Sequence, residues 1–143
     1  MTIIQTTTIR CRLKAELPPH GKCSYSVEGN IVTIHAIGPW NLEFFKKMHY
    51  ELGQILLHEV DFHNFAILLI LKGDSLAAKD GLDYHLNLVR SGPTKALAIH
   101  STLSDAPQIT QSIFQNVYNQ AGLKNRTFNS TEEAKIWLKA QLK

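Results

Sequence analysis

The segment His58–His63 concentrates residue types that bind metal ions, with two imidazoles and two carboxylates among its side chains. The zinc-binding helix of a metalloprotease places its two histidines four residues apart on one face. His58 and His63 lack that spacing, and they straddle the predicted end of a helix. A solvated helix terminus therefore explains this segment better than a metal site does, and we predict neither a metal nor another cofactor.

The sequence carries no recognisable motif of catalysis. It lacks a G-x-S-x-G turn, a phosphate-binding P-loop and the glycine fingerprint of dinucleotide-binding folds. Asp80, Asp83 and His85 lie near the start of one predicted helix. They are expected to form its exposed polar face, opposite Leu82 and Leu86, and this position explains them without a catalytic role. We therefore name no catalytic residue and expect a non-enzymatic protein. An enzyme whose catalytic residues are dispersed along the chain stays an open alternative.

Large apolar side chains gather just beyond the end of a predicted strand. Trp40 comes first, and Phe44, Phe45 and Met48 follow on the next predicted helix. Sheets of α/β proteins place their ligand crevices near strand ends. Two interpretations stay open for this group, namely ordinary core packing and a groove that binds a lipid-like molecule or a partner helix.

Composition indicates one compact domain. The chain has 143 residues, of which 44% are hydrophobic and 19% charged, enough to build a core. Its longest apolar run, Phe65–Leu71, is too short to cross a bilayer, and the start of the sequence lacks signal-peptide features, so we expect a cytoplasmic protein. The net charge of +3 is spread along the chain, which gives no support for a nucleic-acid partner. Cys11 and Cys23 have no CxxC spacing and are expected to be reduced thiols in or near strands.

The first third of the chain predicts an extension and then a hairpin. Residues 1–22 form the predicted extension, in which residues 8–13 alternate as an extra strand would, and residues 23–143 form the predicted domain. Residues 23–28 and 31–37 flank Gly29-Asn30, which suits a type II′ turn. From Asn41, a plausible N-cap, apolar residues recur at the spacing of a helix.

The rest of the chain alternates strands with helices. The run Phe65–Leu71 predicts a central strand buried on both faces, and residues 72–75 predict a turn into the next helix. Residues 95–99 and 125–128 predict further strands. A helix is expected to open at Ser104 or Asp105, and the last helix has a capping box at Ser130 and Glu133. This order predicts an α/β fold, a mostly parallel sheet of four to five strands opened by a hairpin and covered by about four helices.

Three parts of the sequence resemble the SpoIIAA-like proteins of the STAS class, the bacterial anti-sigma-factor antagonists. These parts are the opening hairpin followed by Gly38-Pro39-Trp40, the strand Phe65–Leu71, and the ending 126–138 with its aromatic residue, capping serine, glutamates, alanine, tryptophan and leucine. The resemblance runs from Tyr25 to the carboxyl end. It implies a non-enzymatic regulatory module that acts through protein–protein interaction, with a homodimer as one possible form.

In that class, the turn after the central strand carries an Asp-Ser-Ser/Thr-Gly motif in which a partner kinase phosphorylates a hydroxyl. Asp74 and Ser75 lie at the corresponding turn, although Leu76 and Ala77 follow where the motif would continue. The resemblance therefore implies Ser75 as the candidate phosphoacceptor. Asp74 and Ser75 are also residues that the start of any helix favours, so helix capping is the simpler interpretation.

Overall fold

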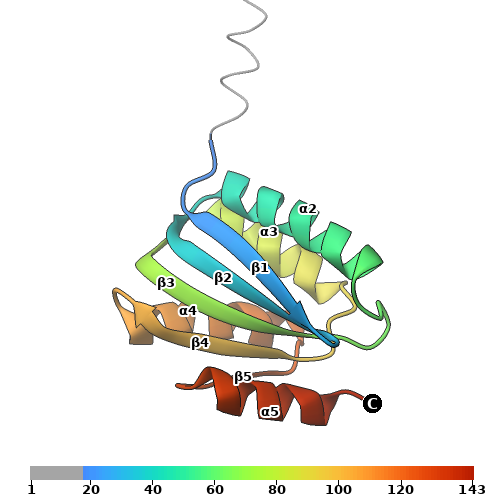
Figure 1. Cartoon of the computed structure of the whole chain (residues 1–143). Coiled ribbons are helices and arrows are strands. Elements are labelled where there is room, and N and C mark those ends of the chain that lie inside the picture. Colours follow the sequence, from blue (N-terminus) through green and yellow to red (C-terminus); the bar gives the residue numbers. More distant parts are fainter. Residues whose placement is uncertain (1–17) are drawn as a thin grey trace, which may run out of the picture.

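The computed structural model describes residues 18–143, so the predicted strand at residues 8–13 and Cys11 lie outside the described residues. Five strands and four helices alternate along this part of the chain (Figure 1). The elements are β1 (Lys22–Glu28), β2 (Ile31–Trp40), α2 (Leu42–His58), β3 (Ala66–Ala77), α3 (Lys79–Arg90), β4 (Leu97–Ser104), α4 (Pro107–Ala121), β5 (Asn125–Thr127) and α5 (Thr131–Gln141).

The strands form one sheet in the order β1-β2-β3-β4-β5. β1 and β2 pair antiparallel, and every later pairing is parallel. Gly29 has a φ of +60°, whereas Asn30 does not have a positive φ, which is the pattern of a type II′ turn. The predicted hairpin and the mostly parallel sheet are thus confirmed.

Helices cover the two faces of the sheet unequally. Right-handed crossovers that proceed in one direction across a sheet place their helices on the same face. Accordingly, α2, α3 and α4 share a core with Val32, Ile34 and Ala36 of β2, while α5 packs on the opposite face (Figure 1). β3 contributes alternate residues to both cores, which confirms that it is a central strand buried on both faces.

Two helix starts confirm the predicted caps. The side-chain oxygen of Asn41 accepts a hydrogen bond of 2.9 Å from the backbone N–H of Phe44. Ser130 accepts one of 3.3 Å from the backbone N–H of Glu133, which confirms one half of the predicted capping box; among the described residues the Glu133 side chain does not accept the reciprocal bond. Both bonds satisfy an N–H group that the first turn of a helix leaves without a partner.

Two other boundaries correct the sequence prediction. Residues 72–75 are not a turn into a helix, because β3 continues to Ala77 and pairs there with Trp40. Consequently α3 starts at Lys79 without a side-chain cap, and Asp74 and Ser75 do not cap it. The third helix starts at Pro107 and not at Ser104 or Asp105, since Ser104 still pairs with Gly73.

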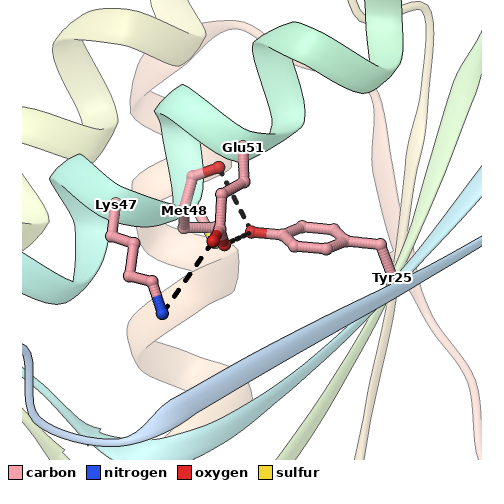
Figure 2. A network of polar contacts seen from close by, with 4 residues as sticks. All are labelled: Tyr25, Lys47, Met48 and Glu51. Atoms are coloured by element: carbon pink, nitrogen blue, oxygen red, sulfur yellow. Dashed lines mark hydrogen bonds and ion pairs between the residues drawn. The ribbon is translucent and has the colours of Figure 1, made fainter.

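Tyr25 links the edge strand β1 to helix α2 through hydrogen bonds. Its hydroxyl donates a 2.9 Å hydrogen bond to Glu51 Oε1 and lies 3.3 Å from the carbonyl oxygen of Met48 (Figure 2). Lys47 Nζ lies 3.8 Å from the second carboxylate oxygen of Glu51. Near this network, burial raises the pKa of the Cys23 thiol to about 11, so this cysteine is unreactive at neutral pH.

Replacing Tyr25 with phenylalanine is expected to lower the free energy of unfolding by about 1 kcal/mol, because a half-buried hydrogen bond to a carboxylate is lost while the ring is kept. Urea denaturation should show a lower midpoint at an unchanged m-value. The exposed Tyr50 offers a matched control, and Tyr50→Phe should leave the midpoint unchanged. Equal midpoints for Tyr25→Phe and the wild type would show that the network does not stabilise the fold.

Candidate functional site

His85 lies in the interior of the protein and is 4% exposed, which corrects the expectation of an exposed residue. The reason is Gly81, one turn earlier on α3. A Cβ atom at Gly81 would lie 2.8 Å from Phe45 Cδ2, so only glycine permits α3 to approach α2 this closely. The close approach turns the Gly81–His85 side of α3 inward. Leu82 and Leu86 are left only partly buried at its flank.

Three polar side chains, two of them buried and the first partly buried, form a row that starts from α2, passes through α3 and ends on α4. His49 Nε2 lies 2.7 Å from His85 Nδ1. His85 Nε2 lies 2.8 Å from the hydroxyl oxygen of Tyr118. We call His49, His85 and Tyr118 the histidine–tyrosine row. The ring of His85 stacks on the ring of Phe45 with a 5.0 Å centroid separation.

Burial keeps the histidine–tyrosine row uncharged at neutral pH. It lowers the pKa of His49 to about 4. It also holds the pKa of His85 well below its ordinary value, and the neighbouring His49 adds to this effect. Burial raises the pKa of Tyr118. All three groups therefore act as neutral hydrogen-bonding partners.

The row lines an apolar cavity of about 90 Å³ between α2, α3 and the sheet. Thr94 is the only other residue of the lining with a polar side chain. The lining residues are Ile34, Met48, His49, Leu52, Leu56, Ile67, Leu69, His85, Leu88, Val89, Gly92, Pro93, Thr94, Leu97, Tyr118 and Leu123. An apolar hollow with a few convergent polar groups is the usual form of a small-molecule site.

The apolar group named from the sequence adjoins this cavity. Trp40, Phe44, Phe45 and Met48 are all buried in the core that α2, α3 and α4 share. Of the four, Met48 alone contributes to the lining of the cavity. Trp40 and Phe45 instead pack against Phe114 of α4, so their burial is accounted for by aromatic contacts.

Ser75 lies beside the start of α4. Its hydroxyl oxygen accepts a hydrogen bond of 3.2 Å from the backbone N–H of Ala106 and one of 2.6 Å from the hydroxyl of Thr110. Ala106 is the residue at the N-cap position of α4, and it offers no side-chain cap. Ser75 therefore supplies from β3 the acceptor that α4 lacks in its own sequence.

The remaining polar candidates lie on the surface. Asp83 forms an exposed 2.8 Å ion pair with Lys79, and Asp80 is also exposed. In the segment His58–His63, His58 contacts the carbonyl oxygen of Gln54 at the end of α2. Within residues 18–143, no three His, Cys, Asp or Glu side chains lie close enough together to hold a metal ion. In that same part of the chain, no helix is both long and apolar enough to cross a membrane.

Sequence reasoning missed the histidine–tyrosine row. His49 belongs to no recognisable motif of a site, because it is a lone histidine beside an apolar stripe. One signal was available. His49 follows Phe45 by one helical turn, as His85 follows Gly81, so both histidines extend stripes that face inward.

These features together define an α/β protein with one sheet, three crossover helices on a single face and an apolar cavity beneath two of them. No protein-family model matches the sequence, and no curated protein matches it. A solved structure does match the fold. It is an uncharacterized protein of the DUF3478 family from Shewanella loihica PV-4, described as having a SpoIIAA-like fold.

The likeness to the Shewanella protein extends over most of both chains. It covers 86% of this chain and 97% of the other, with a TM-score of 0.57 and 15% sequence identity. The chain therefore has a SpoIIAA-like fold, as its resemblance to SpoIIAA-like proteins implied.

Proposed function

We propose that the protein is a non-enzymatic regulatory module of the STAS type that acts by binding another protein at the carboxyl-terminal end of its parallel strands. The supporting observation is a group of exposed large apolar side chains in this region. They are Ile37, Leu76, Leu103 and Ile109, and we call them the sheet-end patch. Apolar side chains that gather on a surface favour association, because burying them against a partner removes them from water.

The pairing of the strands brings the members of the sheet-end patch into one region. Lys72 of β3 pairs with Ile37 on one side and with Leu103 on the other. Leu76 directly follows Ser75, which is hydrogen-bonded to Ala106 at the start of α4. Ile109 lies in the first turn of that helix. Four elements thus contribute to a single end of the molecule.

Ser75 gives the sheet-end patch a means of regulation. The start of α4 favours negative charge, because the N–H groups of the first turn and the helix dipole point toward it. A phosphate on Ser75 would add charge beside Leu76 and would replace the hydroxyl contacts with Ala106 and Thr110. We therefore propose that phosphorylation of Ser75 weakens apolar docking at this end of the sheet.

The partner-binding proposal is tested by placing a charge in the sheet-end patch. Leu76→Asp and Leu103→Asp are each expected to reduce recovery of a partner, cross-linked in cells and identified by mass spectrometry, by about tenfold or more, as loss of an interface hot spot does. Ile136→Asp is the control, because Ile136 is as exposed as Leu76 but lies on α5. Equal recovery with all three variants would contradict the proposal.

A second copy of the chain is one form that the partner can take. Native mass spectrometry of the protein purified from cells reports subunit number and covalent phosphate in one spectrum. A dimer that dissociates in Leu76→Asp but not in Ile136→Asp would place the homodimer contact at the sheet-end patch. A dimer that is unaffected by Leu76→Asp would put that contact elsewhere.

The cavity supports a second candidate function, the binding of a small hydrophobic molecule. Its walls are apolar apart from the histidine–tyrosine row and Thr94. Native mass spectrometry should then show extra mass that leaves on denaturation.

The row itself favours binding over catalysis. A histidine with a pKa of about 4, such as His49, is poorly matched to proton transfer near neutral pH.

A further inference from the structure

The row has a defined direction of proton donation, which begins at Tyr118. This side chain is fully buried, and its hydroxyl contacts only His85 Nε2 among the residues that the structure describes. A buried hydroxyl hydrogen requires an acceptor, so Tyr118 donates to His85 Nε2.

The same direction of hydrogen-bond donation continues through His85 and then His49. Because His85 Nε2 accepts, the neutral His85 ring carries its hydrogen on Nδ1 and donates it to His49 Nε2. The neutral His49 ring must in turn carry its hydrogen on Nδ1. Within the described part of the chain that nitrogen has no hydrogen-bond partner, and it is reached by solvent on a residue that lines the cavity. His49 therefore ends the row with an unused N–H group.

We propose that the Nδ1–H group of His49 is the recognition element of the cavity, and that the cavity binds a small, uncharged apolar molecule with one hydrogen-bond acceptor, such as a ketone or an ester. This proposal rests on the second candidate function. The lining contains no Lys, Arg, Asp or Glu. A carboxylate or phosphate would therefore be buried without a counter-charge, which is costly, so fatty acids and anionic lipid headgroups do not suit this site.

The size of the cavity limits the ligand further. Its volume of about 90 Å³ is smaller than the roughly 150 Å³ of an apolar cavity that accommodates benzene. The portion of the ligand inside is therefore comparable to a five-membered ring. Cyclopentanone and methylenecyclopentane are matched probes of this size. The two molecules have the same shape. They differ only in that the carbonyl oxygen of cyclopentanone is replaced by a CH₂ group in methylenecyclopentane.

Nuclear magnetic resonance titration of the full chain with each probe tests the proposal. Cyclopentanone is expected to bind about three- to tenfold more tightly than methylenecyclopentane, as one hydrogen bond contributes. In His49→Leu the two affinities should become equal, whereas Tyr50→Phe, a change at an exposed neighbour, should keep the preference. Equal affinities in the wild type would overturn the proposed role of His49 but would leave the cavity as a ligand site. Binding of neither probe would overturn the second candidate function itself.

A measurement on the unaltered protein does not depend on how the variants fold. Nitrogen-15 chemical shifts of the imidazole rings distinguish which ring nitrogen carries the hydrogen. Near neutral pH, His49 and His85 should both carry it on Nδ1. A hydrogen on Nε2 of His49 would overturn the proposal, since the ring would then offer the cavity an acceptor and no donor.

Discussion

Replacing Gly38 with alanine is expected to lower the free energy of unfolding by about 3 kcal/mol, the upper end of the usual cost of overpacking. A Cβ atom at this position would overlap the backbone carbonyl oxygen of Asp74 and lie 3.1 Å from Trp40 Cζ2. The carbonyl belongs to β3, which pairs with β2 at this point through Gly38 and Gly73. Relief of the overlap therefore requires the two strands to separate, and urea denaturation measures the loss.

Gly53 provides the matched control for Gly38→Ala. It lies inside α2, and an added Cβ atom there would meet nothing within 4 Å apart from its chain neighbours and the backbone of its own helix. Gly53→Ala should raise the free energy of unfolding by about 0.5 to 1 kcal/mol, because alanine loses less backbone entropy in a helix. A similar stability for the two variants would mean that the close contact between β2 and β3 is not a constraint on the fold.

Acidification should destabilise the protein through His49. Burial holds the pKa of His49 at about 4, whereas a histidine in the unfolded chain titrates near 6.5. Between these values the unfolded chain binds a proton that the folded protein does not, so stability falls as the pH falls. At about 1.4 kcal/mol for each unit of pKa, His49 alone accounts for a loss of roughly 3 kcal/mol between about pH 6.5 and pH 4. Buried His85 acts in the same direction.

The histidine contribution can be separated from general acid effects. No carboxylate is among the causes of the lowered pKa at either histidine, and the aromatic neighbours of His49 are Tyr84 and His85. Urea denaturation at several pH values should give a flatter dependence for His49→Phe than for the wild type. Tyr50→Phe should keep the wild-type dependence. If His49→Phe is as sensitive to acid as the wild type, the folded His49 is not protected from protonation.

The parts of the fold that local rules control could be predicted from the sequence. Gly29-Asn30 has the backbone freedom that a type II′ turn needs, and Asn41 and Ser130 precede apolar stripes of helical period. The alternation of strands and helices predicted a mostly parallel sheet opened by a hairpin, although it did not predict the order of the strands. Residues 1–22 as an extension and residues 23–143 as one domain remain a prediction.

Features that depend on distant contacts could not be predicted. Residues 72–75 contain Gly73 and Asp74, which are common in turns, yet pairing with β2 keeps this segment extended. Ile109 lies four residues before Ile113, a spacing that predicts a shared buried stripe, but it is 60% exposed. Thr110 is buried instead, and its hydroxyl bonds to Ser75. In each case a partner far along the chain decided the outcome.

The histidine–tyrosine row of the cavity also could not be predicted, because it depends on contacts between distant parts of the chain. His49 and His85 are separated by 36 residues, and Tyr118 is a further 33 residues along the chain. No spacing rule connects residues on three different helices. Their meeting depends on Gly81, whose effect is visible only once α2 and α3 are packed together.

The sheet has the same order in space as along the chain, and this has a consequence for how the protein folds. Each parallel strand pairs with the strand that precedes it, so Ala66 joins Ile31 and Leu97 joins Ile67. Every new pairing thus closes a loop of similar length, and no strand has to enter between two that are already paired. Assembly can proceed outward from the hairpin one crossover at a time, with α3 packing on α2 and α4 on α3, and α5 then covers the opposite face of the finished sheet.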